Sequence, residues 1–129
     1  VQKADFIGRC RICSQSYEAL QRVREIEPRI EVGFIAGAAV GDLSRREVDF
    51  LMLNMPLINR KLVEQCRARG LPVHAWTVRQ PDELPRLLDA GVANVITDDP
   101  AAIRQRLEEV QQLEPVERLL LFARNRLAE

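Results

Sequence analysis

The hydrophobic positions along this chain alternate between two periods, one typical of short buried strands and one typical of amphipathic helices. Residues 50–54 form a continuous apolar run closed by a polar asparagine, which is expected for a strand buried on both faces. Other short apolar stretches without helical periodicity predict four more strands, at residues 6–14, 30–35, 73–78 and 92–96. Strands that return after about 20 residues predict a parallel sheet with right-handed connections.

Apolar positions spaced three and four residues apart predict helices between these strands. Ser16, Asn59 and Asp99 are suitable N-caps. Gly70 and Gly91 supply left-handed stops. The helices are expected at residues 16–27, 59–69, 81–90 and from residue 100 onward, and a capping box at residues 44–47 predicts one further helical turn. Alternating strands and helices place the chain in the α/β class.

A last helix is predicted from about Pro115. Its apolar residues share one face: Val116, Leu119, Leu120, Ala123 and Leu127. Packing of this face against the body of the domain is the simpler interpretation, and contact with a membrane surface is the alternative.

Composition and charge narrow the class of protein. The chain has 129 residues, 47% of them hydrophobic, which fits one globular domain spanning 1–129. Lys+Arg and Asp+Glu are equal at 19 each, so no overall charge favours nucleic acid as a partner. No apolar run is long enough for a membrane span, and the first residues lack both Met and a signal-peptide pattern. We therefore expect a soluble piece of a longer protein, of unknown localisation.

The three cysteines, Cys10, Cys13 and Cys66, give an odd count and no disulfide framework. Cys10 and Cys13 match a CxxC pattern, but there is no second pair and no histidine nearby. A structural role is favoured over redox or metal chemistry. A double serine substitution that changed only stability would exclude the thiol alternative.

The carboxyl ends of five parallel strands would meet at one edge of the sheet, where α/β proteins place their ligands. The residues gathered there are Ser14, Gln15, Ala36, Gly37, Asn54, Trp76, Thr77, Thr97 and Asp98. Trp76 offers a rigid face for an aliphatic or sugar-like ligand and an indole N–H that can donate a hydrogen bond. Filling the mouth of the sheet is the alternative role of Trp76. Asn54 and Asp98 are possible residues of the pocket edge.

His74, the only histidine, is two residues before Trp76 and one pleat deeper. A buried, hydrogen-bonded core histidine is favoured over a general base. The adjacent carboxylates Asp98 and Asp99 point apart, so they are a poor acid/base pair. We expect Asp99 to cap a helix and Asp98 to accept backbone amides of a neighbouring loop.

Several familiar catalytic motifs are missing from the sequence. It contains no GxSxG, no GxGxxG, no P-loop and no metal-binding pair of histidines. Hydrolysis of a phosphate ester needs stabilisation of developing negative charge and a proton donor for the leaving oxygen. We predict no catalytic residue and no metal ligand within this chain.

Six segments nevertheless resemble a known family: residues 17–28, 32–35, 41–44, 69–78, 88–92 and 95–100. The most specific blocks are Trp-Thr-Val, beginning at Trp76, and Ile-Thr-Asp-Asp-Pro, ending at Pro100. Together they resemble the C-terminal part of a glycerophosphodiester phosphodiesterase, most closely the branch whose catalytic barrel follows an N-terminal membrane domain. This resemblance implies membrane anchoring of the parent protein.

The resemblance implies a (β/α)₈ barrel, the TIM barrel, that hydrolyses glycerophosphodiesters to glycerol 3-phosphate and an alcohol with a divalent cation, often Ca²⁺ or Mg²⁺. The family's catalytic histidines and acidic metal ligands belong to His-Arg-Gly, Glu-x-Asp and His-Asp blocks on its early strands. No His-Arg-Gly or His-Asp block occurs here, and the single Glu-x-Asp run, Glu47-Val48-Asp49, lacks the histidine blocks that accompany it in the family. Only Trp76 matches a position that the family places in the substrate pocket, against the glycerol or alcohol moiety.

A whole barrel of this kind has about 250 residues, so five strands correspond to its strands four to eight. An open half-barrel exposes strand edges and invites pairing. The expected partner is the missing N-terminal half-barrel or a second copy, as a homo-oligomer or swapped dimer. The leading hypothesis is therefore a C-terminal phosphodiesterase segment that is inactive alone. The alternative is a non-catalytic half-barrel that serves as a binding or assembly module.

Overall fold

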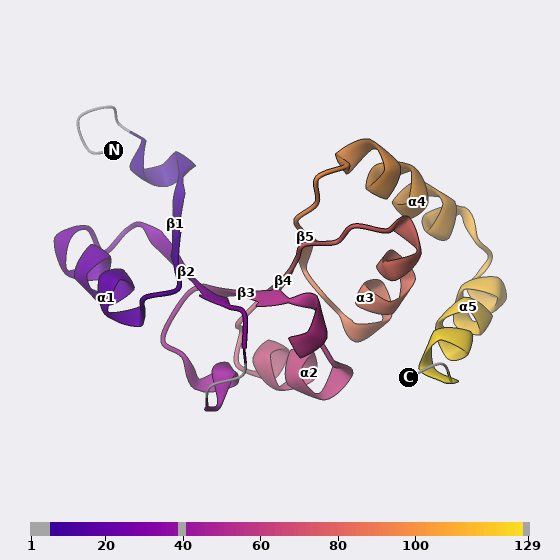
Figure 1. Cartoon of the computed structure of the whole chain (residues 1–129), viewed down its shortest axis with the longest axis horizontal. Helices are drawn as coiled ribbons and strands as arrows, with labels where there is room; N and C mark the ends of the chain where they lie inside the picture. Colours follow the sequence, from indigo (N-terminus) through magenta and orange to yellow (C-terminus); the bar gives the residue numbers. More distant parts are fainter. Residues whose placement is uncertain (1–5, 39–40, 128–129) are drawn as a thin grey trace.

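Five parallel strands form one sheet in the order in which they occur along the chain (Figure 1). They are β1 (Arg11–Ser14), β2 (Glu31–Ala36), β3 (Phe50–Asn54), β4 (Val73–Trp76) and β5 (Asn94–Val95). The structure is a computed structural model that describes residues 6–38 and 41–127. Each strand pairs in parallel with the next, and the sheet forms an open arc. The predicted α/β class, with five parallel strands, is confirmed.

Helices connect the strands, as the periodicity predicts. The α-helices are α1 (Tyr17–Ile26), α2 (Arg60–Ala68), α3 (Leu84–Ala90), α4 (Pro100–Gln112) and α5 (Pro115–Leu127). Short 3₁₀ turns are η2 (Ile7–Arg9), η3 (Leu43–Arg45), η4 (Met55–Leu57) and η5 (Pro81–Glu83). The side chains of Ser16, Asn59 and Asp99 accept first-turn amides at 3.2, 2.9 and 3.0 Å, so all three predicted N-caps are confirmed. Gly70 and Gly91 have φ of 68° and 86°, as expected of left-handed helix stops.

Several predicted boundaries are wrong. Residues 7–9 form η2, so β1 begins only at Arg11. β4 ends at Trp76 instead of residue 78, and β5 comprises only Asn94 and Val95. The helix expected at residues 81–90 begins as η5, because the carboxylate of Glu83 accepts the amides of residues 79 and 80 and holds a tighter turn.

The capping box predicted at residues 44–47 does not form. Asp42 caps the turn instead, since its carboxylate accepts the amide of Ser44 at 3.1 Å and the hydroxyl of Ser44 at 2.6 Å. The Ser44 hydroxyl is therefore engaged as a donor, and the cap of η3 lies two residues earlier than expected. No α-helix lies between β2 and β3 in the described residues, unlike the other connections.

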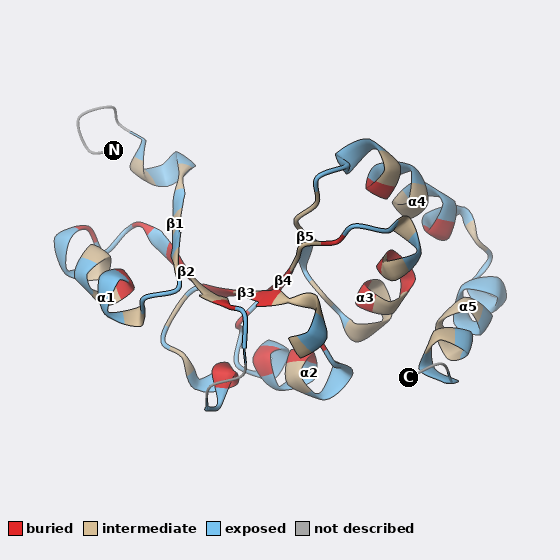
Figure 2. Ribbon diagram, viewed as in Figure 1, coloured by how far each residue is buried: buried red, intermediate tan, exposed pale blue. Residues whose placement is uncertain are grey.

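The outer side of the sheet carries the hydrophobic core, which consists of two clusters (Figure 2). The larger cluster packs the outward residues of β3 and β4 against α2 and α3: Leu51, Leu53, Val73, Ala75, Val63, Cys66 and Leu87. The smaller cluster joins Leu20 of α1 to Ile30 and Val32. Phe34 and Val48 contact both clusters and connect them.

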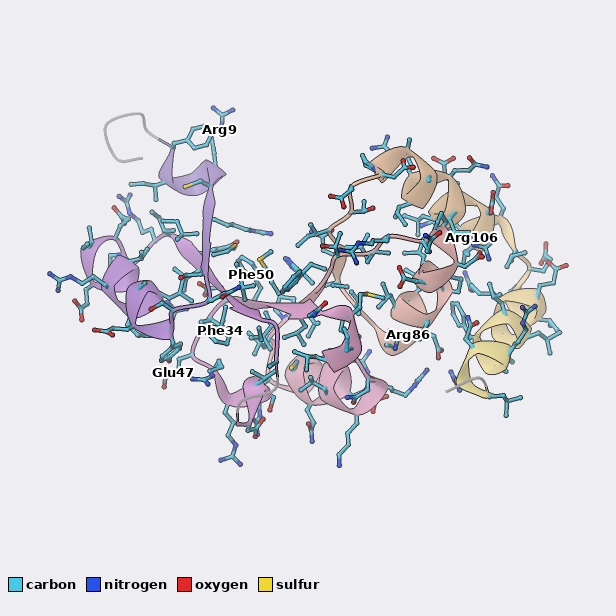
Figure 3. The ribbon with its side chains drawn as sticks, viewed as in Figure 1. Arg9, Phe34, Glu47, Phe50, Arg86 and Arg106 are labelled. Atoms are coloured by element: carbon cyan, nitrogen blue, oxygen red, sulfur yellow. The ribbon has the colours of Figure 1, made fainter. Side chains whose placement is uncertain are left out.

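The other side of the sheet is concave, and no helix of the described residues covers it (Figure 1). Strand residues alternate between the two sides, so His74 and Trp76 face the concave side, whereas Val73 and Ala75 face outward. Phe50 and Phe34 lie on opposite sides of the sheet (Figure 3). The molecule is thus a partial (β/α)₈ barrel whose inner wall is open.

Helix α5 packs against α3, but not through the predicted face. Of the five residues of that face, Val116, Leu119, Leu120 and Leu127 are 62–90% exposed, and the small Ala123 is half-buried. The residues on the opposite side, among them Leu121 and Phe122, are half-buried. Arg126 fixes this rotation by forming a bidentate ion pair with Asp89 of α3, with N–O distances of 2.8 and 2.6 Å. The expectation that the larger apolar face packs against the domain is therefore wrong.

Candidate functional site

The parallel register brings the ends of the strands to one edge of the sheet, as the topology predicts. Asn54 and Trp76 are direct partners in the pairing of β3 and β4. Asp98 follows β5 at the same edge, two residues after Ile96, whose backbone still pairs with the β4 side. The residues singled out from the sequence therefore share an edge.

Trp76 is half-buried, and a hydrogen bond to the neighbouring strand β3 holds its indole in place. Its Nε1–H donates to the carbonyl oxygen of Met52 at 3.0 Å, so this donor is already satisfied within the sheet. Because the indole N–H already has an acceptor, the faces of the ring are the part of Trp76 that a ligand can contact. Trp76 can therefore contribute an apolar platform, whereas the donor function considered from the sequence is taken up by the fold.

Asn54 uses its side-chain oxygen locally. Its Oδ1 accepts the amide of Met55 at 2.9 Å and starts the turn η4, which lies directly after β3. The side chain is half-buried beside Trp76 in the register. Asn54 thus shapes the edge of the sheet, and its amide nitrogen is the group left to face a ligand.

Asp98 differs from its sequence-based interpretation. It is exposed, and within the described residues its carboxylate has no hydrogen bond or ion pair, so the expected bond to a neighbouring loop is absent. The neighbouring residues accept the nearby backbone amides instead: Thr97 Oγ1 accepts the amide of Asp99 at 3.1 Å, and Asp99 caps α4. This leaves the Asp98 carboxylate hydrated and free at the carboxyl edge.

His74 is buried on the concave side and stacks against Phe50, with 4.8 Å between the ring centroids and 20° between the planes. The burial predicted for His74 is confirmed, but the predicted hydrogen bond is absent from the described structure. Burial lowers the pKa of His74, and the nearby Arg11 guanidinium lowers it further. The imidazole is therefore neutral at physiological pH and serves as an apolar packing surface.

Two residues beside the stack of His74 and Phe50, Gly33 and Arg11, were not predicted from the sequence. A Cβ on Gly33 would collide with the Phe50 ring, so the glycine makes room for that ring on the inner wall. The guanidinium group of Arg11 lies over the Phe50 ring, 5.5 Å from the ring centroid. Gly33 lies opposite Phe50 in the strand register. Aligning the inward-facing residues of neighbouring strands would have indicated that this glycine makes room for the Phe50 ring.

The cysteines give no sign of reactive chemistry. Cys66 is buried in the outer core, where burial raises its pKa. Burial also raises the pKa of the Cys13 thiol, with Arg11 acting in the opposite direction, so thiolate formation is disfavoured. All three cysteines are free thiols.

The described residues contain no group of three or more His, Cys, Asp or Glu side chains arranged to hold a metal ion. None of five cavities among the described residues is lined by Trp76, Asn54 or Asp98, although one of them lies beside the turn η4 that follows β3. The most enclosed one, about 20 Å³, lies among α2, α3 and α5. The candidate site is thus one wall of a site, with an aromatic platform and polar edge groups.

Comparison with known proteins identifies the family of this chain. The sequence profile of the Glycerophosphoryl diester phosphodiesterase family matches residues 7–102. The chain belongs to this family. The glycerophosphodiester phosphodiesterase of Caldanaerobacter subterraneus subsp. tengcongensis is 27% identical over 107 residues, which cover 80% of this chain and 44% of the relative.

Solved structures of family members share the fold. A glycerophosphodiester phosphodiesterase from Parabacteroides distasonis matches with a TM-score of 0.76 at 22% identity, over 87% of this chain and 48% of that protein. A phosphodiesterase from Oleispira antarctica, solved with the product sn-glycerol-3-phosphate, matches with a TM-score of 0.68 at 22% identity, over 74% and 40%. The chain therefore spans less than half the length of these phosphodiesterases.

No helix within residues 6–38 and 41–127 combines the length and the apolar character needed to cross a membrane. The N-terminal membrane domain suggested by the sequence resemblance remains a prediction about residues beyond this chain.

Proposed function

We propose that this chain is the C-terminal part of a glycerophosphodiester phosphodiesterase and forms the substrate-side wall of its barrel. The observation that carries the proposal is the open concave side: five parallel strands present Phe50, His74 and Trp76 there, and no described helix covers them. The inner wall of a barrel is normally closed by the remaining strands. The complete protein would hydrolyse a glycerophosphodiester to glycerol 3-phosphate and an alcohol.

In this proposal Trp76 packs its ring against the glycerol or alcohol moiety. The hydrogen bond to the Met52 carbonyl fixes the plane of the indole, so little side-chain entropy is lost when a ligand binds. Asn54 and Asp98 border the same edge and would contact hydroxyl groups of the substrate. His74 positions Phe50 and takes no part in proton transfer, because its imidazole is buried and stacked.

The residues described here do not fit a divalent cation, since no cluster of three suitable ligands exists among them. The cation expected for the family, Ca²⁺ or Mg²⁺, and the acid and base of the reaction would be held by the other half of the barrel. Asp98 alone offers one free carboxylate, which is too few donors for a cation that takes six or more oxygens.

Two measurements test the proposal. We expect the reading frame that precedes Val1, or a separate partner polypeptide, to contain His-Arg-Gly and Glu-x-Asp blocks. The purified chain should release no glycerol 3-phosphate from glycerophosphocholine with Ca²⁺ or Mg²⁺, and addition of the missing half should restore metal-dependent release. Turnover by the chain alone would refute this division of labour. Specific ligand binding without turnover in the completed barrel would favour the non-catalytic module.

The role of Trp76 is tested in the completed barrel. Trp76→Ala removes the platform and should raise KM about tenfold with a smaller change in kcat, since contact with the non-reacting part of a substrate is lost. Trp76→Phe is the matched control, because it keeps an aromatic face and loses only the donor to Met52. If both variants raise KM equally, the indole N–H is the important group and the platform is the wrong explanation.

A further inference from the structure

Helix α5 has apolar side chains on two sides, and only one side is used within the chain. Half-buried Leu121 and Phe122 lie on the side turned toward the domain, where α5 contacts α3. Val116, Leu119, Leu120 and Leu127 form an outer stripe that is 62–90% exposed. A helix with apolar residues on both sides is expected to be buried on both sides.

The rotation of α5 is fixed, so the exposed stripe is a stable feature. Asp89 of α3 accepts two hydrogen bonds from Arg126 and is also paired with Arg60 of α2. The Asp89 side chain is only 11% exposed, which makes this junction among three helices rigid compared with a surface ion pair. The outer stripe cannot turn inward without breaking it.

Two opposite charges border this stripe on one flank. Glu117 and Arg124 are seven residues apart and therefore differ by only about 20° around the helix axis. Both are exposed, and Arg124 has no ion pair within the described residues. Glu117 accepts the amide of Glu114 with one oxygen and keeps the other free.

These positions are self-complementary under a two-fold axis. When two α5 helices cross in antiparallel orientation near residues 120–123, Val116 of one helix meets Leu127 of the other, and Leu120 meets Ala123. The same arrangement places Glu117 of each copy opposite Arg124 of the other, giving two symmetric ion pairs. We propose that the outer face of α5 is the interface of a homodimer of this chain, built on this antiparallel helix pair.

A second copy suits this face better than a lipid surface. On a membrane, Glu117 would face anionic headgroups and be repelled by them. Arg126 is already paired with Asp89, so the residues that border the stripe offer little net positive charge for anionic lipid. The missing half of the barrel would close the concave side, whereas α5 lies on the outer side of α3 (Figure 1). The interface thus does not depend on the proposed catalytic role, and it lies beyond residues 7–102, which match the family.

Sedimentation velocity of the 129-residue chain tests the interface. A single helix pair buries a small area, so we expect a dimer with a dissociation constant in the micromolar range. Leu120→Glu places a charge on the stripe and should abolish the dimer. Its side chain is 65% exposed, so folding should be retained, which far-UV circular dichroism verifies. Arg118→Glu, an exposed position of α5 away from the stripe, is the control and should leave the dimer intact.

Charge reversal tests the antiparallel pairing itself. Glu117→Arg and Arg124→Glu should each raise the dissociation constant about tenfold, since each variant places like charges opposite one another twice in the dimer. The double variant restores opposite charges and should return the constant to within about threefold of the parent value.

Three results would overturn the proposal. The chain could remain monomeric into the sub-millimolar range. Self-association could persist in Leu120→Glu, which would assign it to the open strand edges of β1 and β5. Alternatively, monomeric chain could bind vesicles that contain phosphatidylglycerol through the same stripe. A double charge variant that stays as weak as the single variants would refute the antiparallel geometry.

Discussion

Asp89→Asn removes the charge that holds α2, α3 and α5 together. The pKa of Asp89 is lowered to about 2, first by the hydrogen bonds from Arg126 and then by Arg60. The ordinary value for an aspartate is 3.8. Because one pKa unit corresponds to about 1.4 kcal/mol, the ionised form stabilises the fold by about 2 kcal/mol. The side chain is mostly buried, so solvent screening reduces this value little.

The pH dependence has a definite direction. The folded chain keeps Asp89 ionised at pH values where the unfolded chain has already bound a proton, so acid favours unfolding. The contribution is complete above about pH 5, declines as the pH falls through the interval from about 4 to 2, and is absent below it. Asp89→Asn should therefore be destabilised at pH 7 and equal to the parent chain near pH 2.

Urea unfolding at both pH values, followed by circular dichroism, measures the difference. Asp82→Asn is the matched control, because Asp82 is 94% exposed and lies 3.9 Å from its nearest cation, Arg106. Hydrogen exchange should show faster opening of α5 in Asp89→Asn and unchanged exchange in the control. A loss below about 0.5 kcal/mol at pH 7, or a loss of equal size at both pH values, would contradict the assigned role of Asp89.

Three further predictions concern the inner wall and one helix cap. Gly33→Ala should cost about 1–3 kcal/mol in urea unfolding because its methyl group meets the ring of Phe50, whereas Gly37→Ala, with open space around it, should cost much less. Asn59→Ala removes the cap of α2 and should lower stability by about 1 kcal/mol, measured in the same way; no loss would show that the cap is dispensable. Burial lowers the pKa of His74, so the NMR titration of this single imidazole should have its midpoint below 6.5, and stability should fall as the pH drops through 6.5; a midpoint above 6.5 would contradict its burial.

The parts of the fold that depend on neighbouring residues could be predicted from the sequence. The number and order of the strands, the N-caps at Ser16, Asn59 and Asp99 and the stop at Gly91 each depend on a few adjacent positions, and all of them are confirmed by the structure. The turn at residues 43–45 shows the limit of this reasoning, because two cap residues compete there. Asp42 wins over Ser44 by accepting both the amide and the hydroxyl of that serine.

The parts that depend on distant contacts could not be predicted. The indole of Trp76 donates to a carbonyl 24 residues earlier, which no local pattern indicates. The rotation of α5 is set by Asp89 and Arg126, 37 residues apart, and the sequence pattern alone favours the larger apolar stripe as the buried one. Asp98 was expected to be bonded because aspartates after strands often accept amides, yet Thr97 and Asp99 satisfy the nearby amides first.

The division of the outer core into two clusters has a consequence for how the chain opens. The described residues of the connection between β2 and β3 form the short turn η3 and no α-helix. Among the described residues, Phe34 and Val48 contact both clusters on the outer side, and Ala36 of β2 belongs to the larger one. The smaller cluster rests on three fully buried or nearly buried side chains, Leu20, Ile30 and Val32.

Such a boundary separates cooperative units. The unit formed by β1, α1 and β2 has little apolar area to lose and should detach while β3, β4, α2 and α3 stay folded. Its amides should therefore exchange together, in a step that requires less free energy than global unfolding. The line at Phe34 and Val48 would then mark the place where this half-barrel first comes apart, and where a protease would find its earliest entry.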